Sequence, residues 1–128
     1  MTAERFYGAF LAADEEALSE VVAADAVWAV AGESALAGEH RGPTGIAELR
    51  RQLGTLTNGT WRPLRENSFD IAVSEHHAVI IDRFLAERNG RELDSHEAIV
   101  VAPPGAGPIQ RLFHYVHDPA AHSAFWSR

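Results

Sequence analysis

The sequence predicts a single α+β domain over residues 1–128, with its helices in the first half of the chain and its long strands in the second. Two changes of pattern indicate this class. Apolar residues recur every three or four positions before Gly59, which is typical of helices, and alternate with polar residues after it, as in strands. No internal repeat or long linker divides the chain, and its length is enough for one hydrophobic core.

The helical half contains three expected helices. Its periodic apolar face is interrupted at Asp14, a suitable N-cap for a second helix that closes at residues 21–22. A short apolar run follows, and then a glycine-punctuated loop over residues 32–45. The third helix is expected to begin at Pro43, because proline is favoured at the first helical position, and to stop at Asn58-Gly59.

Strands are expected in the second half, and Asn89-Gly90 is the signal of a tight hairpin between two of them. The segments are one or two strands within residues 61–73, and single strands at 79–86, 93–101 and 109–116. Their order along the chain predicts an antiparallel meander packed against the helices.

Composition restricts the class of function. The formal net charge is -7, and all 11 Lys+Arg residues are arginines, so the chain would repel a phosphate backbone and nucleic-acid binding is not expected. The absence of lysine excludes Schiff-base chemistry, and the absence of cysteine excludes disulfides and zinc–thiolate sites. No apolar run approaches the roughly 18 residues of a membrane span, and the first residues do not resemble a signal peptide. A cytoplasmic protein without a membrane partner is therefore expected.

Two glycine-containing motifs resemble those of a known family. Residues 28–32, Trp-Ala-Val-Ala-Gly, and residues 36–42, Leu-Ala-Gly-Glu-His-Arg-Gly, are similar to W-x-x-P-G…L-A-G-x-x-x-G, with Ala31 where proline is usual. This is the pattern of SnoaL-like proteins, the polyketide-cyclase relatives within the nuclear-transport-factor-2-like superfamily. The resemblance extends through residues 90–93, 105–109 and 118–126, and so covers nearly the whole chain.

The resemblance implies a cone-shaped fold, in which a curved antiparallel sheet wraps around three N-terminal helices and leaves an apolar pocket open at one end. It also implies a homodimer that binds a hydrophobic small molecule. Members of the superfamily include isomerases, cyclases, hydrolases and non-catalytic modules, so the fold alone does not select a reaction.

The acid–base residues of ketosteroid isomerase, a member of this superfamily, are replaced in the chain. Aligned on the resemblance, the isomerase's helix-1 tyrosine falls on Phe6 and its general-base aspartate on Ala29, and neither side chain can move a proton. Tyr7 is one residue late and would point about 100° away around the helix. Phe6 remains a candidate for the apolar wall of the pocket.

The SnoaL-like cyclases provide another set of candidates. They use an aspartate at the end of the last long strand, assisted by a histidine on a neighbouring strand. Asp118 occupies a similar position, with His114 where tryptophan is usual, and His96 is the nearest assisting histidine. A carboxylate buried in an apolar cone would suit proton transfer near neutral pH. The alternative is that Asp118 caps the turn before Pro119.

Strand alternation separates the two faces on which these candidates lie. His96 shares a face with Asp94 and Ala98, whereas the opposite face is more apolar and looks like core. That opposite face consists of Leu93, Ser95, Glu97, Ile99 and Val101. The pattern weakens His96 as a pocket residue, and a solvated or interface position is the alternative for both His96 and His114.

Further residues are candidates for binding the ligand. Trp28 would line or floor the pocket, Tyr115 lies on a mixed face of the last strand, and His40 could gate the pocket mouth. Arg83 either polarises an oxygen of the ligand or pairs with an acidic strand neighbour, and pairing is favoured. No metal site is expected, because the adjacent His76-His77 would point to opposite faces of a strand.

Two functional hypotheses remain open. The first is an enzyme that acts on a hydrophobic cyclic small molecule by acid–base catalysis without a cofactor. Asp118 would be its proton shuttle, and His96 or His114 the partner of Asp118. The alternative is a non-catalytic ligand-binding or dimerisation module of the same fold, favoured by the loss of both isomerase residues.

Overall fold

The computed structural model describes residues 2–30, 32, 34–64, 69–105 and 107–127. Ala31 of the first glycine-containing motif, and residues 65–68 within the segment expected to hold one or two strands, lie outside the described residues. The elements are α1 (Thr2–Leu11), α2 (Glu15–Val21), β1 (Val22–Val30), β2 (Gly38–Arg41), α3 (Gly42–Leu56), β3 (Arg62–Pro63), β4 (Asp70–Val73), β5 (Ala78–Arg88), β6 (Arg91–Ala102), β7 (Ile109–Val116) and α4 (Pro119–Trp126).

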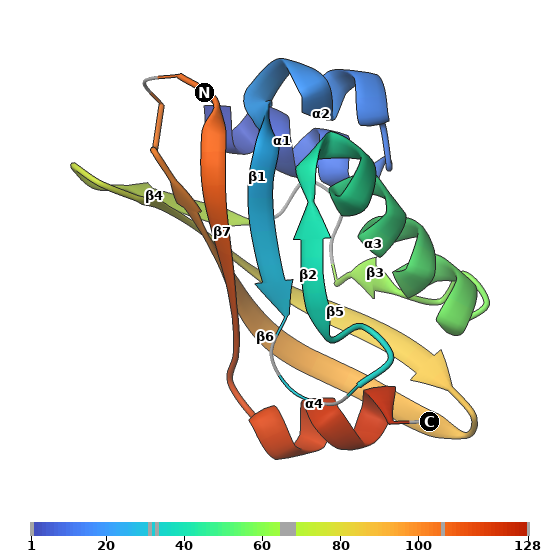
Figure 1. Ribbon diagram of the computed structural model, residues 1–128. Helices are drawn as coiled ribbons and strands as arrows, with labels where there is room; N and C mark the ends of the chain where they lie inside the picture. The colour runs from blue at the N-terminus through green and yellow to red at the C-terminus, as the bar shows by residue number, and fades with distance from the viewer. Residues whose placement is uncertain (1, 31, 33, 65–68, 106, 128) are drawn as a thin grey trace.

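A curved sheet forms one layer, and α1, α2 and α3 lie together against one of its faces (Figure 1). The fourth helix, α4, lies across the end of the sheet near the β5–β6 hairpin. The α+β class, with helices gathered on one face of a curved sheet, is confirmed. No helix in the described part of the chain is long and apolar enough to cross a membrane.

The sheet is mixed, which corrects the expectation of a wholly antiparallel one. Its order is β2-β1-β7-β6-β5-β3, with β4 also paired to β5. Neighbouring strands are antiparallel except β1 and β7, which are parallel. The long stretch of chain between β1 and β7 makes this possible, because parallel neighbours need a crossover and cannot be joined by a tight turn.

The predicted helices are confirmed with small shifts of their ends. Asp14 is the N-cap of α2, and its side chain accepts a hydrogen bond of 3.1 Å from the backbone N–H of Ala17. Pro43 lies in the first turn of α3, as expected from the sequence. Asn58 and Gly59 follow the end of α3 with φ of 51° and 81°, a left-handed backbone that cannot continue the helix.

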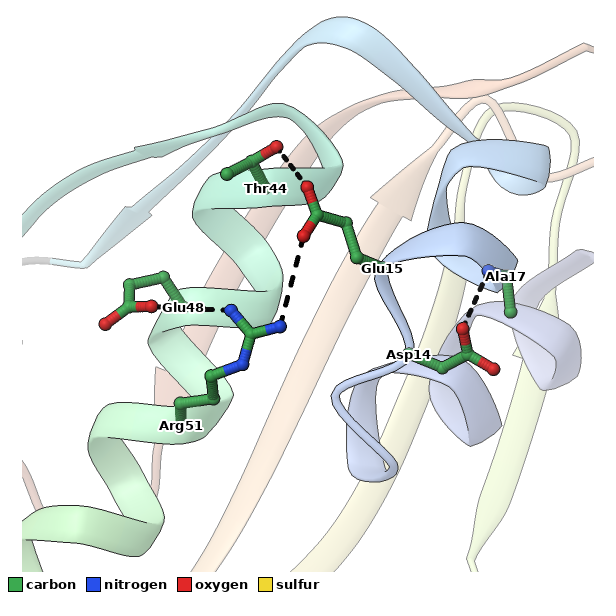
Figure 2. A network of polar contacts seen from close by, with 6 residues as sticks. All are labelled: Asp14, Glu15, Ala17, Thr44, Glu48 and Arg51. Atoms are coloured by element: carbon green, nitrogen blue, oxygen red, sulfur yellow. Dashed lines mark hydrogen bonds and ion pairs between the residues drawn. The ribbon is translucent and has the colours of Figure 1, made fainter.

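Exposed polar contacts join the starts of α2 and α3 (Figure 2). Glu15 accepts a hydrogen bond from the hydroxyl of Thr44 and lies 3.9 Å from Arg51 Nη2. Arg51 Nη1 in turn lies 3.4 Å from Glu48. Because these side chains are largely exposed, the pairs contribute at most about 1 kcal/mol each to the free energy of unfolding.

The predicted hairpin is confirmed, and both of its strands are longer than expected. Asn89 and Gly90 connect β5 to β6 with φ of 52° and 77°, as a tight two-residue turn requires. The pairing of β5 with β6 runs from Arg88↔Arg91 to Ala78↔Val101 without a shift in register. This continuous register fixes which side chains of both strands face the helices.

Two elements were not expected from the sequence. Strand β2 lies inside the predicted glycine loop, where it pairs with β1. Helix α4 follows Asp118, whose side chain accepts a 3.0 Å hydrogen bond from the backbone N–H of Ala121. Arg88 Nη1 donates to the carbonyl of Phe125 at 3.1 Å, and Arg91 Nη1 donates to that of Ala124 at 3.0 Å. These two arginines tie the C-terminal end of α4 to the hairpin.

Candidate functional site

An apolar cavity lies between the inner face of the sheet, α1, α3 and α4. Its apolar walls are Phe10, Trp28, Val30, Leu36, Leu49, Leu53, Trp61, Phe84, Ile99 and Trp126, and its polar side chains are Glu97, His114 and His122. The space open to the centres of water molecules is about 30 Å³. That is room for roughly two waters, so the cavity as folded admits only a small group.

The polar side chains of the cavity form one cluster around a buried carboxylate. Glu97 is 7% exposed, and His114 Nε2 donates a 2.5 Å hydrogen bond to its Oε1. His122 Nε2 lies 3.7 Å from the other carboxylate oxygen, Oε2. The two imidazole rings are 5.8 Å apart, centre to centre. Both histidines therefore face the same carboxylate from different elements.

Strand register and the cap of α4 bring this cluster together. Glu97 lies on the inner face of β6, between the buried Ser95 and Ile99. His114 lies on β7 directly opposite Ile99, one step diagonally from Glu97. His122 lies one turn into α4, where its backbone N–H donates to the carbonyl of Asp118 at 3.0 Å. Asp118 thus helps to place His122 by starting the helix that carries it.

The environment of His122 keeps its ring neutral. Burial lowers the pKa of His122 below its ordinary value of 6.5, the charge of His114 lowers it as well, and the Glu97 carboxylate opposes this. A neutral imidazole offers one donor and one acceptor nitrogen. The cluster therefore combines a carboxylate with a neutral ring that can accept a proton, which is the composition of an acid–base site.

The lowered pKa of His122 predicts a loss of stability in mild acid. The unfolded chain takes up a proton on His122 near pH 6.5, whereas the folded protein does so only at lower pH. We therefore expect the full contribution of His122 to the free energy of unfolding above about pH 6.5. This contribution should fall as the pH decreases below that value. Urea unfolding at pH 7.5 and pH 5.5 measures the difference.

Two variants isolate the contribution of His122. His122→Phe keeps an aromatic ring and should flatten the pH dependence of the free energy of unfolding. His77→Phe removes an exposed histidine and should leave that dependence as in the parent. An unchanged pH dependence in His122→Phe would show that another group causes the loss.

A second buried polar pair lies beside the cluster. Tyr7 on α1 is fully buried, and its hydroxyl donates a 2.5 Å hydrogen bond to Asp82 Oδ2 on β5. Asp82 Oδ1 also accepts from the backbone N–H of Arg83 at 2.7 Å. In the β5–β6 register, Asp82 lies directly opposite Glu97. The inner face of the sheet therefore carries two neighbouring carboxylates.

The charges of this region keep Tyr7 protonated. Burial raises the pKa of Tyr7 far above its ordinary value, and the hydrogen bond to Asp82 and the charges of Asp82 and Glu97 raise it further. Tyr7 is thus a permanent donor to Asp82. Tyr7 is not among the residues that line the cavity, and its hydroxyl is directed to Asp82.

The structure places two of the candidate site residues at the cavity and adds two more. His114 and Trp28 line it. Glu97 and His122 were not singled out from the sequence. Strand alternation does place Glu97 on the buried face of β6. An acidic residue on the same face as Leu93, Ile99 and Val101 was the signal that could have identified it as a site residue. For His122 no such pattern exists, because α4 itself was not expected.

The other two catalytic candidates lie outside the cavity. Asp118 is exposed and serves as the N-cap of α4, which is the alternative that the sequence left open. His96 is exposed on the outer face of β6, where its ring lies 5.6 Å from that of His117. Neither side chain lines the cavity, so the expected Asp118–His96 arrangement is corrected to a cluster centred on Glu97.

Four candidate binding residues also lie away from the cavity lining. Phe6 is fully buried one layer behind it, 6.1 Å from the ring of Trp28. Arg83 forms a bidentate ion pair with Asp94 on the outer face, with N···O distances of 2.6 and 2.7 Å. The structure therefore shows the favoured pairing.

Tyr115 is 58% exposed on the outer face of β7. His40 Nε2 lies 2.9 Å from the carbonyl of Leu36.

No metal centre is evident in the described ranges of the chain, where no three His, Asp or Glu side chains converge to hold an ion. Nε2 of His114 already donates its hydrogen bond of 2.5 Å to the Glu97 carboxylate.

Known proteins resemble the chain along most of its length. The uncharacterized protein Rv0034 of Mycobacterium tuberculosis is 32% identical over 123 residues, which cover 96% of this chain and 92% of the relative. The structure of Bal32a, from a soil-derived mobile gene cassette, is 29% identical in sequence and superimposes with a TM-score of 0.82. The match covers 98% of this chain and 93% of Bal32a. An NTF2-like protein from Burkholderia xenovorans is 17% identical with a TM-score of 0.79, over 98% and 93% of the two chains.

The chain has the nuclear-transport-factor-2-like fold. It belongs to the same family as Rv0034. No family model matches the chain. The resemblance carried by the glycine-containing motifs is confirmed at the level of the fold, and this fold places the Glu97 cluster at the end of the sheet covered by α4.

Proposed function

We propose that this protein with the nuclear-transport-factor-2-like fold is a cofactor-independent enzyme that moves a proton on a small hydrophobic cyclic molecule. The observation that carries the proposal is the buried carboxylate of Glu97, held by His114 at 2.5 Å inside an apolar cavity. The cavity as folded has room for about two waters, so a cyclic ligand requires the apolar side chains of its walls to move apart, which brings the ligand against this carboxylate. His122 faces the same carboxylate at 3.7 Å.

The roles follow from the chemistry of the three side chains. Glu97 takes a proton from the ligand and returns it at another position, so no external oxidant or reductant is needed. His114 holds the carboxylate in one orientation through its Nε2–H. His122, neutral because it is buried, can receive or supply the proton that Glu97 exchanges. The apolar walls exclude water, which strengthens each of these electrostatic contacts.

Hydrogen–deuterium exchange tests this function across several classes of substrate at once. The protein in D2O is mixed with a panel of small cyclic ketones, lactones and epoxides, and exchange or hydrolysis is followed by NMR. We expect accelerated exchange with one chemical class. Glu97→Gln should lower that rate by at least about a hundredfold, since a positioned acid or base contributes that much or more.

A matched control separates chemistry from folding. Glu92→Gln changes an exposed glutamate on the same strand and should leave the rate unchanged. His114→Gln gives a second variant of the cluster in case Glu97→Gln fails to fold. If wild-type protein binds members of the panel but accelerates none of their reactions, the protein is a non-catalytic binding module, and the enzyme proposal fails.

We also propose that the protein is a homodimer formed through the outer face of the sheet. The large side chains Ile81, Phe113 and Tyr115 are 46%, 39% and 58% exposed there. In the strand register, Ile81, Ala98 and Tyr115 form one row across β5, β6 and β7. A contiguous apolar row on an open sheet face is typical of a surface that another copy covers.

Light scattering tests the dimer. The expected mass in dilute solution is twice the 14.0 kDa of one chain. Tyr115→Glu places a charge at one end of the row, on its most exposed side chain, and should return the mass to that of a monomer. Val73→Glu changes a residue on β4 that is 53% exposed and outside the row, and should leave the dimer intact. A monomeric wild-type protein would rule out this interface.

A further inference from the structure

Helix α4 closes one end of the cavity. His122 and Trp126 of this helix line the cavity, and α4 lies across the end of the sheet near the β5–β6 hairpin (Figure 1). The space inside, about 30 Å³, holds roughly two waters, so a cyclic ligand does not fit the cavity as folded. One of the elements that form its walls must therefore move to admit such a ligand.

The other walls are tied more firmly into the fold than α4. Strands β1, β5, β6 and β7 are held in the sheet by backbone pairing, and α1 and α3 bury five residues each. Leu36, between β1 and β2, has its carbonyl 2.9 Å from His40 Nε2. Helix α4 buries only Phe125 and Trp126, and no backbone hydrogen bond of the described residues links it to a strand. Helix α4 is therefore the wall that is easiest to displace.

The start of α4 is suited to act as a hinge. The backbone N–H of His117 still donates to the carbonyl of His96 on β6 at 3.0 Å, so the sheet extends to this residue. Helix α4 begins at Pro119, and the bond from the N–H of Ala121 to the Asp118 side chain belongs to its own cap. A rotation of the backbone between His117 and Asp118 would therefore swing the helix as a unit and leave the strand pairing and the cap in place.

The other end of α4 is held by two arginines of the hairpin. Arg88 Nη1 donates to the carbonyls of Phe125 and Ser127 at 3.1 and 2.6 Å. Arg91 Nη1 donates to the carbonyls of Ala124 and Ser127 at 3.0 and 3.2 Å. The last carbonyls of a helix lack partners within it and carry partial negative charge, which guanidinium groups satisfy. These side-chain contacts can break and re-form while the sheet stays intact.

We infer that α4 is a lid over the cavity, hinged at Asp118 and latched by Arg88 and Arg91. Its purpose rests on the proposed function, because only a site that takes up a ligand needs to open. Opening the lid removes His122 from the Glu97 carboxylate, which is 3.7 Å away in the closed form. Closure over a ligand therefore completes the Glu97 cluster and excludes water in the same step.

Thiol labelling measures the opening of the lid without a substrate. The chain has no cysteine, so an introduced cysteine is its only thiol. Ile99→Cys places the thiol in the cavity wall, and Val101→Cys places it on the same face of β6 outside the cavity lining. The parent side chains are 3% and 0% exposed, so a coloured aromatic disulfide reagent reaches either thiol only after an opening.

The cavity thiol is expected to react at least about tenfold faster than the Val101→Cys thiol, because a local opening costs less than global unfolding. Its rate should also depend less on urea, since a moving lid exposes less surface than an unfolded chain. Leu53→Cys on α3 places a thiol in the same cavity wall and replaces Ile99→Cys if that variant does not fold.

Variants of the latch locate the opening at α4. Arg88→Gln and Arg91→Gln, made in the Ile99→Cys protein, should each speed labelling of the cavity thiol about 3- to 10-fold, because each removes hydrogen bonds that only the closed lid makes. Arg62→Gln is the matched control. It changes an exposed arginine of β3 and should leave the labelling rate unchanged.

Tyr7→Phe separates movement of the lid from global unfolding. The Tyr7–Asp82 hydrogen bond joins α1 to β5 and stays intact when the lid alone opens. The change should therefore speed labelling of Val101→Cys, which needs global unfolding, and leave that of Ile99→Cys unchanged.

Two outcomes would overturn the lid. One is equal labelling of Ile99→Cys and Val101→Cys with the same dependence on urea. The other is a labelling rate of Ile99→Cys that neither Arg88→Gln nor Arg91→Gln alters. A lid that opens as expected in a protein that exchanges no deuterium into any substrate of the panel would refute the enzyme proposal alone, so the two failures are distinguishable.

Discussion

Alanine at Gly42 is expected to destabilise the protein by roughly 2–5 kcal/mol. Gly42 begins α3 with φ of 65°, a left-handed backbone that costs an alanine about 1–2 kcal/mol. A Cβ atom there would lie 2.6 Å from the carbonyl oxygen of Ala24 on β1. Backbone atoms cannot turn aside as a side chain can, so the clash adds about 1–3 kcal/mol. The free energy of unfolding in urea measures the sum.

Gly90→Ala separates the two contributions to this loss. Gly90 has φ of 77°, and no atom of the described residues lies within 4 Å of an added Cβ, so it reports the backbone cost alone. We expect a loss of about 1–2 kcal/mol at Gly90. If Gly42→Ala and Gly90→Ala lower the free energy of unfolding by the same amount, the contact with Ala24 does not limit how closely α3 approaches β1.

Tyr7→Phe is expected to lower the free energy of unfolding by about 1.5–3 kcal/mol, because it removes a buried hydrogen bond to a carboxylate. The change leaves the ring and its 4.8 Å contact with Phe69 in place. Asp82→Leu alone should also destabilise, since it leaves the Tyr7 hydroxyl buried without its acceptor. The double variant removes both polar groups and should lose less than the sum of the single changes.

The Tyr7–Asp82 cycle has its own controls. Ser123→Ala removes an exposed hydroxyl and should change the free energy of unfolding by no more than about 0.5 kcal/mol. The high pKa of Tyr7 adds a pH signature. Unfolded tyrosine ionises near pH 10 and the folded one does not, so stability from Tyr7 should decline above about pH 10. Strict additivity of the two single changes would show that the pair is not coupled.

Local signals in the sequence were sufficient for most of the fold. Asp14, Pro43 and Asn89-Gly90 act through the conformations of their own segments, and each marks an element boundary in the structure. Strand β2 was not predicted, because it is only four residues long and contains a glycine. Its conformation depends on its pairing with β1. The parallel pairing of β1 and β7 likewise depends on contacts between distant segments.

The site was harder to predict than the fold. The sequence identifies His114 and Trp28, but strand alternation places Glu97 on a largely apolar face, and only its hydrogen bond to His114 shows that it belongs to the cluster. Helix α4 depends on Asp118 and on carbonyl contacts from Arg88 and Arg91, which lie far away in sequence. A residue of such a helix, His122, cannot be placed in a site before the tertiary contacts are known.

The pairing of β1 with β7 bears on how the protein is made. On the ribosome, β1 emerges with only β2 beside it, because its other neighbour, β7, follows all the other described strands in the chain. One edge of the β1–β2 hairpin therefore stays open until β7 has been synthesised, as an exposed strand available to other nascent chains. Completion of the sheet, and of the cavity beneath α4, therefore waits for the segments that follow β6. Contacts this distant in sequence also make folding slow relative to a helical bundle of equal length.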